Sequence, residues 1–158
     1  MRIWKRVGLV VAVAGVVAAL SASGATTFCT HVYAATPYWQ STGIWLNAGD
    51  TIVISARGCV AYWTCHACGS ARYCGPNGTG GFAYEPCYLA PRCRRNALVG
   101  SIRMWNGAHR YFDVGSCRTL TASVSGYLCL GMNDSVHNGG SYNNHGAWDV
   151  SFTIYRRY

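Results

Sequence analysis

The segment from residue 133 to residue 147 holds the side chains of this chain that are best suited to chemistry. It contains one carboxylate, Asp134, with four asparagines and no lysine or arginine. Carboxylate and amide oxygens, together with backbone carbonyls, suit a hard cation such as Ca²⁺, which takes about six to eight oxygens. A zinc site would need more histidine or cysteine. The alternative is a glycine- and asparagine-rich turn without a ligand, because asparagine tolerates left-handed backbone conformations.

The acidic residues limit which reactions the chain could catalyse. There are only five of them, namely Asp50, Glu85, Asp113, Asp134 and Asp149. Hydrolysis of a glycosidic bond needs a pair of carboxylates, but Asp50 lies in a turn and Asp149 on an expected strand. The sequence contains neither a Gly-x-Ser-x-Gly nor a His-Glu-x-x-His motif. We therefore expect a binding protein and not an enzyme, with no catalytic residues.

The cysteines predict a disulfide-rich protein. There are nine, and six of them fall between residues 59 and 93. In an exported chain such a density indicates disulfides. Structural zinc usually takes two close pairs of ligands, whereas only Cys65 and Cys68 are close here, so zinc is the alternative. The odd number leaves one thiol free, buried or joined to another chain in an oligomer, and the spacing does not give the pairing.

Residues 1–25 have the layout of a secretory signal peptide. A positive start is followed by an uncharged apolar run over residues 7–20 and by the small residues Ser23-Gly24-Ala25. The run of about 14 residues is shorter than the roughly 20 that cross a bilayer. We expect cleavage after Ala25, secretion without a stable membrane anchor, and a single domain over residues 26–158. The alternatives are an uncleaved anchor and a later cut after Ala34, which would leave eight cysteines.

The charge of the expected mature chain argues against a nucleic-acid partner. Removing residues 1–25 takes away Arg2, Lys5 and Arg6, and leaves ten arginines against five acidic residues, a net charge of +5. The arginines are scattered apart from short groups at residues 92–95 and 156–157. Nucleic-acid proteins usually show a basic stripe with interleaved aromatics. Scattered positive charge serves solubility or contact with an anionic surface.

Alternation with a period of two recurs along the chain and predicts β-strands. The alternating segments are residues 51–56, 98–104, 111–114, 127–132 and 148–155. Asn106-Gly107 lies between two of them and is a strong hairpin signal. In residues 98–104 we expect Leu98 and Ile102 to point inward, with Val99 and Ser101 outward. Several short strands with one apolar face each predict an all-β, antiparallel β-sandwich with jelly-roll or Greek-key topology.

Two segments do not alternate, and we expect loops there. Residues 62–97 are rich in glycine, cysteine and tyrosine, and residues 133–147 are polar. Loops on a rigid sandwich commonly carry function, and loops longer than about 12–15 residues are usually functional or disordered. Several aromatic side chains near these segments could stack on the apolar face of a sugar. Of these we favour Trp63, although single aromatics in a sandwich are more often packing residues.

The polar loop resembles the calcium loop of the PA-IL-type galactophilic lectins of bacteria. The resemblance rests on Asn133-Asp134, then Asn143-Asn144-His145-Gly146, then an alternating final strand. Other matching pieces follow in the same order and cover roughly residues 30–155: Thr42-Gly43-Ile44, Ala48-Gly49-Asp50, Gly58, Tyr62, Gly75-Pro76-Asn77-Gly78, Ala97-Leu98-Val99 and Ser125-Gly126. The resemblance implies a small jelly-roll-like sandwich with calcium at one end.

In that family the sugar bridges the metal through two hydroxyls. Carried over to this chain, the metal ligands would be the side chains of Asp134, Asn143 and Asn144, the carbonyl of Tyr62 and a loop carbonyl near Gly140. Asp134, Asn143 and Tyr62 would also face the sugar. The function implied is that of a secreted, calcium-dependent, galactose-type carbohydrate-binding domain.

The chain also departs from that family. The loop from Asp134 to Asn143 is two residues longer than in the best-known member, which bears on the assignment of Gly140. That member holds galactose with a histidine and a glutamine after the Gly-Pro turn, whereas residues 79–86 contain neither. Glu85 is the candidate for that role here, with a surface charge as the alternative. The second hypothesis for the whole chain is a disulfide-stabilised structural or adhesive β-domain that binds protein and not sugar.

Overall fold

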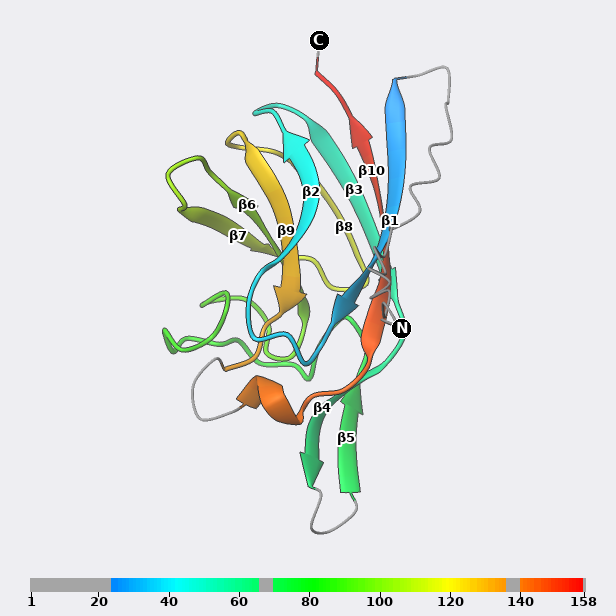
Figure 1. The fold of residues 1–158 in the computed structure, drawn as a ribbon, viewed down its shortest axis with the longest axis vertical. Helices are drawn as coiled ribbons and strands as arrows, with labels where there is room; N and C mark the ends of the chain where they lie inside the picture. The colour runs from blue at the N-terminus through cyan, green and yellow to red at the C-terminus, as the bar shows by residue number, and fades with distance from the viewer. Residues whose placement is uncertain (1–23, 66–69, 136–139, 158) are drawn as a thin grey trace, which may run out of the picture.

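A computed structural model describes residues 24–65, 70–135 and 140–157 of the chain (Figure 1). Ten strands and one short 3₁₀ helix follow one another: β1 Ala25–Tyr33, β2 Gln40–Leu46, β3 Thr51–Arg57, β4 Val60–Cys65, β5 Ser70–Cys74, β6 Leu98–Arg103, β7 His109–Asp113, β8 Cys117–Thr121, β9 Gly126–Met132, η1 Gly140–Asn143 and β10 Ala147–Tyr155. Within these residues, no helix has the length and apolar character needed to cross a membrane. The expected signal peptide lies outside the described residues except for Gly24 and Ala25.

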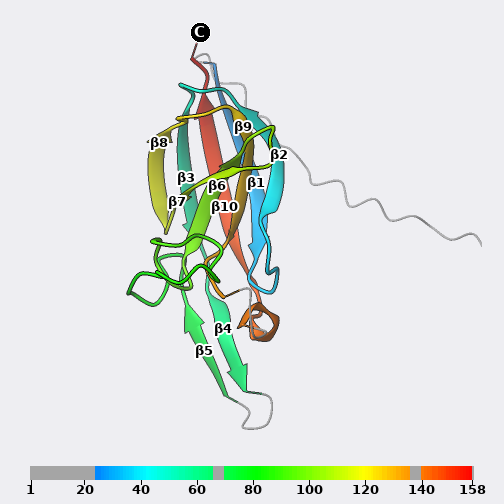
Figure 2. The same cartoon turned by 90° about the vertical axis from the view of Figure 1, so that its left-hand side faces the viewer.

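Two four-stranded antiparallel sheets form the body of the molecule (Figures 1 and 2). Sheet A has the order β1-β10-β3-β8, and sheet B has the order β2-β9-β6-β7. Successive strands of the chain largely alternate between the two sheets, as expected of an eight-stranded jelly roll. The prediction of an all-β antiparallel sandwich is therefore confirmed.

The core lies between the sheets and follows from the alternation. In β10, Trp148, Val150, Phe152 and Ile154 are at most 2% exposed, whereas Tyr155 is 45% exposed. Apolar residues of the other strands meet them from both sheets, among them Ile52, Ile54, Leu98, Ile102, Leu128 and Leu130. Each such side chain contributes about 1.5–3 kcal/mol when it leaves water. The hairpin at Asn106-Gly107 also forms, and Gly107 adopts the positive φ of 81° that this turn requires.

The outer face of sheet B differs from the expectation. Val99 and Ser101 of β6 were expected to point toward solvent, but both are fully buried. Trp39 and Leu89 pack with Val99 in a second, smaller apolar cluster outside the sheet. The ring of His109 stacks on Trp39 with 5.5 Å between centroids. The prediction was wrong here because loops cover this face, and strand alternation gives no signal of a covering loop.

Strands β4 and β5 form a hairpin within the segment that was expected to be a loop. Figure 1 shows this hairpin extending beyond the end of the sandwich. Its register shifts between Ala61 and Trp63, so Tyr62 is an extra residue in a β-bulge. The bulge interrupts the period-two pattern, which explains why alternation did not reveal the strand. Residues 75–97 are largely irregular, as expected.

The strand β1 bears on the two candidate cleavage sites. All nine of its residues pair with β10, and Phe28 stacks on Phe152 at 5.5 Å. A cut after Ala34 would remove the whole strand and uncover β10. A cut after Ala25 would remove only its first residue, so the fold is compatible with the earlier site.

The cysteines described with their side chains are all free thiols. They are Cys29, Cys59, Cys74, Cys87, Cys93, Cys117 and Cys129. Cys29 and Cys117 lie in one row across sheet A with β10 and β3 between them. Three strand spacings make about 14 Å, whereas the Cα atoms of a disulfide are at most about 7 Å apart. The expected disulfides are thus not found among these seven residues.

Candidate functional site

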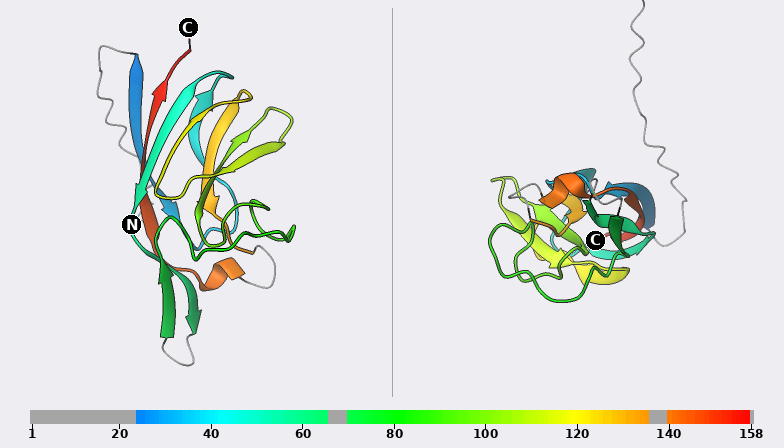
Figure 3. Two further views of the ribbon diagram at one scale, coloured as in Figure 1. Left: turned by 180° about the vertical axis from the view of Figure 1, so that it is seen from behind. Right: turned by 90° about the horizontal axis from the view of Figure 1, so that it is seen from below.

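The polar loop, the base of the β4–β5 hairpin and residues 75–97 come together at one end of the sandwich. Figures 1 and 2 show η1 and the hairpin at this end, and the right-hand view of Figure 3 looks onto it. Two isolated bridges connect the three segments. Ala61 pairs with His145, and Tyr88 pairs with Ser135. The loop expected to carry the chemistry is therefore tied on both sides to other segments.

The side chains of Asp134 and Asn144 are bonded directly to each other. The Nδ2 of Asn144 donates to Oδ2 of Asp134 at 2.8 Å. The same Nδ2 lies 3.4 Å from the carbonyl of Ala34 and 3.6 Å from Sδ of Met132. Three acceptors around one nitrogen fix the orientation of the amide, so its oxygen points the other way. The second oxygen of Asp134, Oδ1, accepts the backbone N–H of Ser135 at 2.7 Å.

Two amide oxygens at this site are buried and have no hydrogen-bond donor in the described part of the protein. They are Oδ1 of Asn143 and Oδ1 of Asn144, and Asn144 is fully buried. Leaving such a group unsatisfied costs about 1–3 kcal/mol, so buried acceptors normally have a partner. A bound cation would satisfy both oxygens. The donor set therefore fits a hard cation such as Ca²⁺.

Asp134 differs from the other four acidic residues in its partners. Each of the others forms an ion pair: Asp50 with Arg156, Glu85 with Arg95, Asp113 with Arg94, and Asp149 with His31 and Arg57. No ion pair is formed by Asp134 with any residue that the structure describes. Its negative charge is also felt nearby, because after burial it contributes to the raised pKa values of Cys74 and Tyr88. Among the described residues, Asp134 is therefore the acidic side chain without a basic partner.

Tyr62 lies on β4 and Gly140 in the polar loop, and the bridge of Ala61 with His145 connects these two segments. Backbone hydrogen bonds of 2.9 Å run both ways between Ala61 and His145. Because the bridge is antiparallel, Tyr62 and Asn144 are the next residues along it, and β4 contacts η1. The bulge keeps Tyr62 out of the regular pairing with β5. Gly140 is the first residue of η1, and residues 136–139 lie outside the described part of the chain.

The carboxylate of Glu85, the candidate for contacting the sugar, already has two partners in the protein. Its carboxylate pairs with Arg95 at 2.9 Å and accepts the N–H of Tyr84 at 3.1 Å. Its own backbone N–H, that of Tyr84 and the charge of Arg95 lower its pKa despite partial desolvation. Tyr88, which follows in the same turn, forms the bridge to Ser135. Glu85 therefore lies at the rim of the site and is held by Arg95.

Trp63 lies on the hairpin next to the site and is 38% exposed. The guanidinium of Arg72 is 5.4 Å from the centre of its ring. Trp63 belongs to β4, the strand that contacts η1. The structure thus brings Trp63 to the same end of the molecule as Asp134.

Asn133 has a structural role that the sequence did not reveal. Its side chain is fully buried and donates to the carbonyls of Ala90, Cys93 and Arg94 at 3.0–3.2 Å. Its Oδ1 accepts the N–H of Ala90 at 2.8 Å. These bonds fasten the irregular residues 75–97 to the end of β9, directly before Asp134. The adjacent residues Asn133 and Asp134 therefore have different roles: Asn133 stabilises the fold, and Asp134 belongs to the candidate site. Only their contacts distinguish these roles.

The described residues contain no group of three or more His, Cys, Asp or Glu side chains suited to a metal. A zinc site at Cys65 and Cys68 is not tested, because Cys68 lies outside the described part. The described donors next to Asp134 are its own carboxylate and the unpartnered amide oxygens of Asn143 and Asn144. Such a donor set is typical of calcium and not of zinc.

The chain resembles solved structures in its fold. No family model matches the chain, and no curated protein matches it. A solved chain described as the EclA N-terminal domain, a PllA-like lectin, has a TM-score of 0.57 and 23% sequence identity. The match covers 80% of this chain and 94% of that chain. At this level of identity the comparison shows that the two share the fold.

Proposed function

We propose that this chain is a calcium-dependent carbohydrate-binding domain. The observation that carries the proposal is the pair of buried, unpartnered amide oxygens of Asn143 and Asn144 beside Asp134, the one acidic residue without a described basic partner. The lectin description of the solved chain with the same fold supports a sugar as the ligand. Export with removal of residues 1–25 belongs to the same proposal.

In this proposal Asp134, Asn143 and Asn144 hold the ion through side-chain oxygens, and Tyr62 and a residue near Gly140 add backbone carbonyls. When bound, calcium supplies open coordination positions that two sugar hydroxyls can fill. The carboxylate of Asp134 accepts a hydrogen bond from one sugar hydroxyl, which orients the ring. The amide of Asn143 and the backbone of Tyr62 give further contacts.

Galactose-type sugars are the first to test because of the resemblance of the calcium loop. Glu85 is already bonded to Arg95, so we expect it to position that arginine at the rim and not to bind a hydroxyl by itself. Trp63 is the proposed stacking residue, since aromatic rings pack on the apolar face of a pyranose.

A glycan array probed with the purified protein tests the proposal. It is run with added calcium, with excess chelator, and with calcium restored after chelation. Binding that disappears with chelator and returns with calcium is expected for at least one class of glycan. The adhesive alternative is favoured if no glycan on the array is bound in calcium, but the domain binds a protein partner with or without chelator.

A further inference from the structure

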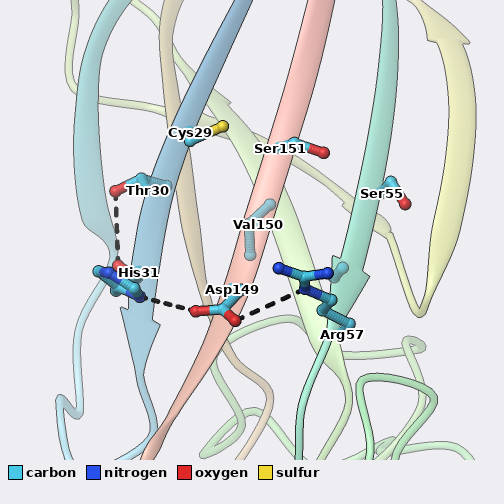
Figure 4. A pocket seen from close by; sticks show the side chains of 9 residues that line it. Cys29, Thr30, His31, Ser55, Arg57, Asp149, Val150 and Ser151 are labelled. Atoms are coloured by element: carbon cyan, nitrogen blue, oxygen red, sulfur yellow. Dashed lines mark hydrogen bonds and ion pairs between the residues drawn. The ribbon is translucent and has the colours of Figure 1, made fainter. Parts of the chain in front are cut away.

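The outer face of sheet A contains a hollow of about 690 Å³ that lies apart from the polar loop (Figure 4). Three neighbouring strands line it, namely β1, β10 and β3. The outward side chains are those of Cys29, His31, Ser55, Arg57, Asp149 and Ser151. None of them belongs to the proposed calcium site. Small-ligand sites usually have volumes of about 300–1,000 Å³, so the hollow has a suitable size.

The strand register arranges these side chains in two rows. His31, Asp149 and Arg57 are paired across the three strands, and so are Cys29, Ser151 and Ser55. Residues two apart on a strand point to the same face. Both rows therefore project from the outer face, while the intervening Val150 is buried in the core. The sheet itself fixes the spacing of the polar groups.

Asp149 is held between its two neighbours. Its Oδ1 lies 3.0 Å from Nδ1 of His31, and its Oδ2 lies 3.6 Å from Nε of Arg57. An ionised carboxylate has about four acceptor positions, so it can accept further hydrogen bonds. The two neighbours come from different strands, β1 and β3, and each lies against a different oxygen of the carboxylate.

The remaining groups of the hollow have hydrogen-bonding capacity to spare. Among the described contacts, the terminal nitrogens of Arg57 and the hydroxyls of Ser55 and Ser151 have no protein partner. Donors and acceptors therefore alternate across three strands, over about 10 Å of the sheet surface. Vicinal hydroxyls, each of which both donates and accepts, match this pattern.

The charge and composition narrow the ligand class further. The charges of Arg57 and Asp149 cancel, and His31 adds charge only when it is protonated. A polyanion would meet Asp149 unfavourably. None of the six outward side chains is Tyr, Trp, Phe or Met, and of the residue types enriched at the cores of protein–protein interfaces only arginine is present, as Arg57. The chemistry thus favours a neutral, hydroxyl-rich small ligand.

We propose that this hollow is a second saccharide site that works without calcium. Two neighbouring sugar hydroxyls donate to the carboxylate of Asp149, while Arg57 donates to sugar oxygens and Ser55 and Ser151 complete the contacts. The domain then binds glycans at two places, one dependent on the metal loop and one built on sheet A. This proposal does not rest on the calcium site, because it uses other residues.

The test is a glycan array of neutral and acidic oligosaccharides, probed with the purified protein in excess chelator. Binding to neutral saccharides is expected to persist in chelator. It should fall at least about tenfold in Asp149→Asn and in Arg57→Gln, and it should be unchanged in Asp134→Asn. Calcium-dependent binding should be lost in Asp134→Asn and unchanged in Asp149→Asn and in Arg57→Gln. Asp149 and Arg57 are both exposed, so these variants are expected to fold, which circular dichroism and thermal unfolding will check.

Three outcomes would overturn the second site, whatever happens at the calcium loop. The first is an array without any neutral saccharide retained in chelator. The second is chelator-resistant binding that is the same in wild type and Asp149→Asn. The third is a change of oligomeric state in Asp149→Asn by gel filtration, which would show that a second copy of the chain occupies this face. If every sample keeps the chelator-resistant binding but none shows calcium-dependent binding, the proposed function is contradicted and the second site is not.

Discussion

The side chain of Asn144 donates a 2.8 Å hydrogen bond from its Nδ2 to Oδ2 of Asp134, while its own Oδ1 is buried without a partner among the described residues. This relationship combines two things that a cation site needs. It orients the only carboxylate of the loop, and it leaves a second oxygen ready to bind. The two residues are ten positions apart and are separated in the chain by η1, so the fold creates the pair.

Asn144→Ala removes one neutral ligand and the hydrogen bond that orients Asp134. We expect calcium affinity to fall roughly tenfold, equivalent to about 1.4 kcal/mol, with a loss of about 1 kcal/mol in the free energy of unfolding. Calorimetric titration and urea unfolding measure the two effects. Asn106→Ala, in the hairpin turn between β6 and β7, is the matched control and should leave calcium affinity unchanged. Unchanged affinity in Asn144→Ala would remove this side chain from the site.

Gly78→Ala and Gly80→Ala compare two glycines with nearly the same backbone conformation. Their φ angles are +75° and +80°, but a Cβ on Gly78 would collide with the backbone of Arg95 and Ala97, whereas the space around Gly80 is open. Gly80→Ala should cost about 1–2 kcal/mol from the left-handed conformation alone. Gly78→Ala should cost at least about 2 kcal/mol more, because backbone must move. Equal unfolding free energies in the two variants would contradict the close packing of Gly78 against residues 95–97.

Asp50 should make the fold sensitive to acid. Its side chain is fully buried, and burial by itself would raise its pKa. The N–H groups of Asn47 and Arg157 and the guanidinium of Arg156, at 2.6–3.1 Å, outweigh burial and hold the pKa below the ordinary value of 3.8. A carboxyl with a lowered folded-state pKa stabilises the protein above its unfolded pKa, and this stability is lost as the pH falls through the folded pKa.

Asp50→Asn removes this ionisable group, so the comparison of variant and wild type isolates its effect. At neutral pH the variant should be less stable by about 1.5–3 kcal/mol. The difference should shrink below pH 3.8 as Asp50 of the wild type becomes protonated. Urea unfolding over a pH series measures it. A difference that stays constant down to full protonation would mean that the charge of Asp50 contributes nothing.

The thiols should divide into two classes by reactivity. Burial raises the pKa of Cys74 and Cys93 to about 11, in each case with a smaller contribution from nearby negative groups, against an ordinary value of 9.0. Two pH units correspond to about 100-fold less thiolate, the reactive form. Cys29, Cys59 and Cys117 are exposed. In the native protein iodoacetamide should label these three residues first, and peptide mass spectrometry will assign the sites. Resistance of the exposed three until a reductant is added would show that they are in disulfides.

The fold could be read from the sequence where one side of a strand is buried and the other is exposed. The alternation of β10 predicted its four buried residues, and Asn106-Gly107 predicted the hairpin. The same reasoning failed for Val99 and Ser101, because loops cover the outer face of sheet B. It missed β4, where the bulge at Tyr62 breaks the period of two.

The candidate site could be predicted as a set of residue types but not as a set of contacts. Asp134 and the asparagines stood out because they are the polar residues of one loop. Nothing in the sequence separates Asn133, which fastens residues 75–97, from Asn143 and Asn144, whose oxygens have no partner among the described residues. Glu85 is likewise indistinguishable from a free carboxylate until its contact with Arg95 at 2.9 Å is known. These roles depend on residues distant in sequence, and no local pattern records them.

We propose that the negative charge of Asp134 holds a calcium ion together with the amide oxygens beside it. Asp134→Asn keeps the size of the side chain and removes its charge, and calcium affinity depends on the number of charged ligands. We expect calorimetric titration to show calcium binding about 100-fold weaker than in wild type, equivalent to about 2.8 kcal/mol. Calcium-dependent sugar binding should be lost and the fold retained. Asp149→Asn, which removes a charge from the outward face of β10, should bind calcium like wild type. Equal calcium affinity in wild type and Asp134→Asn would contradict the proposed site.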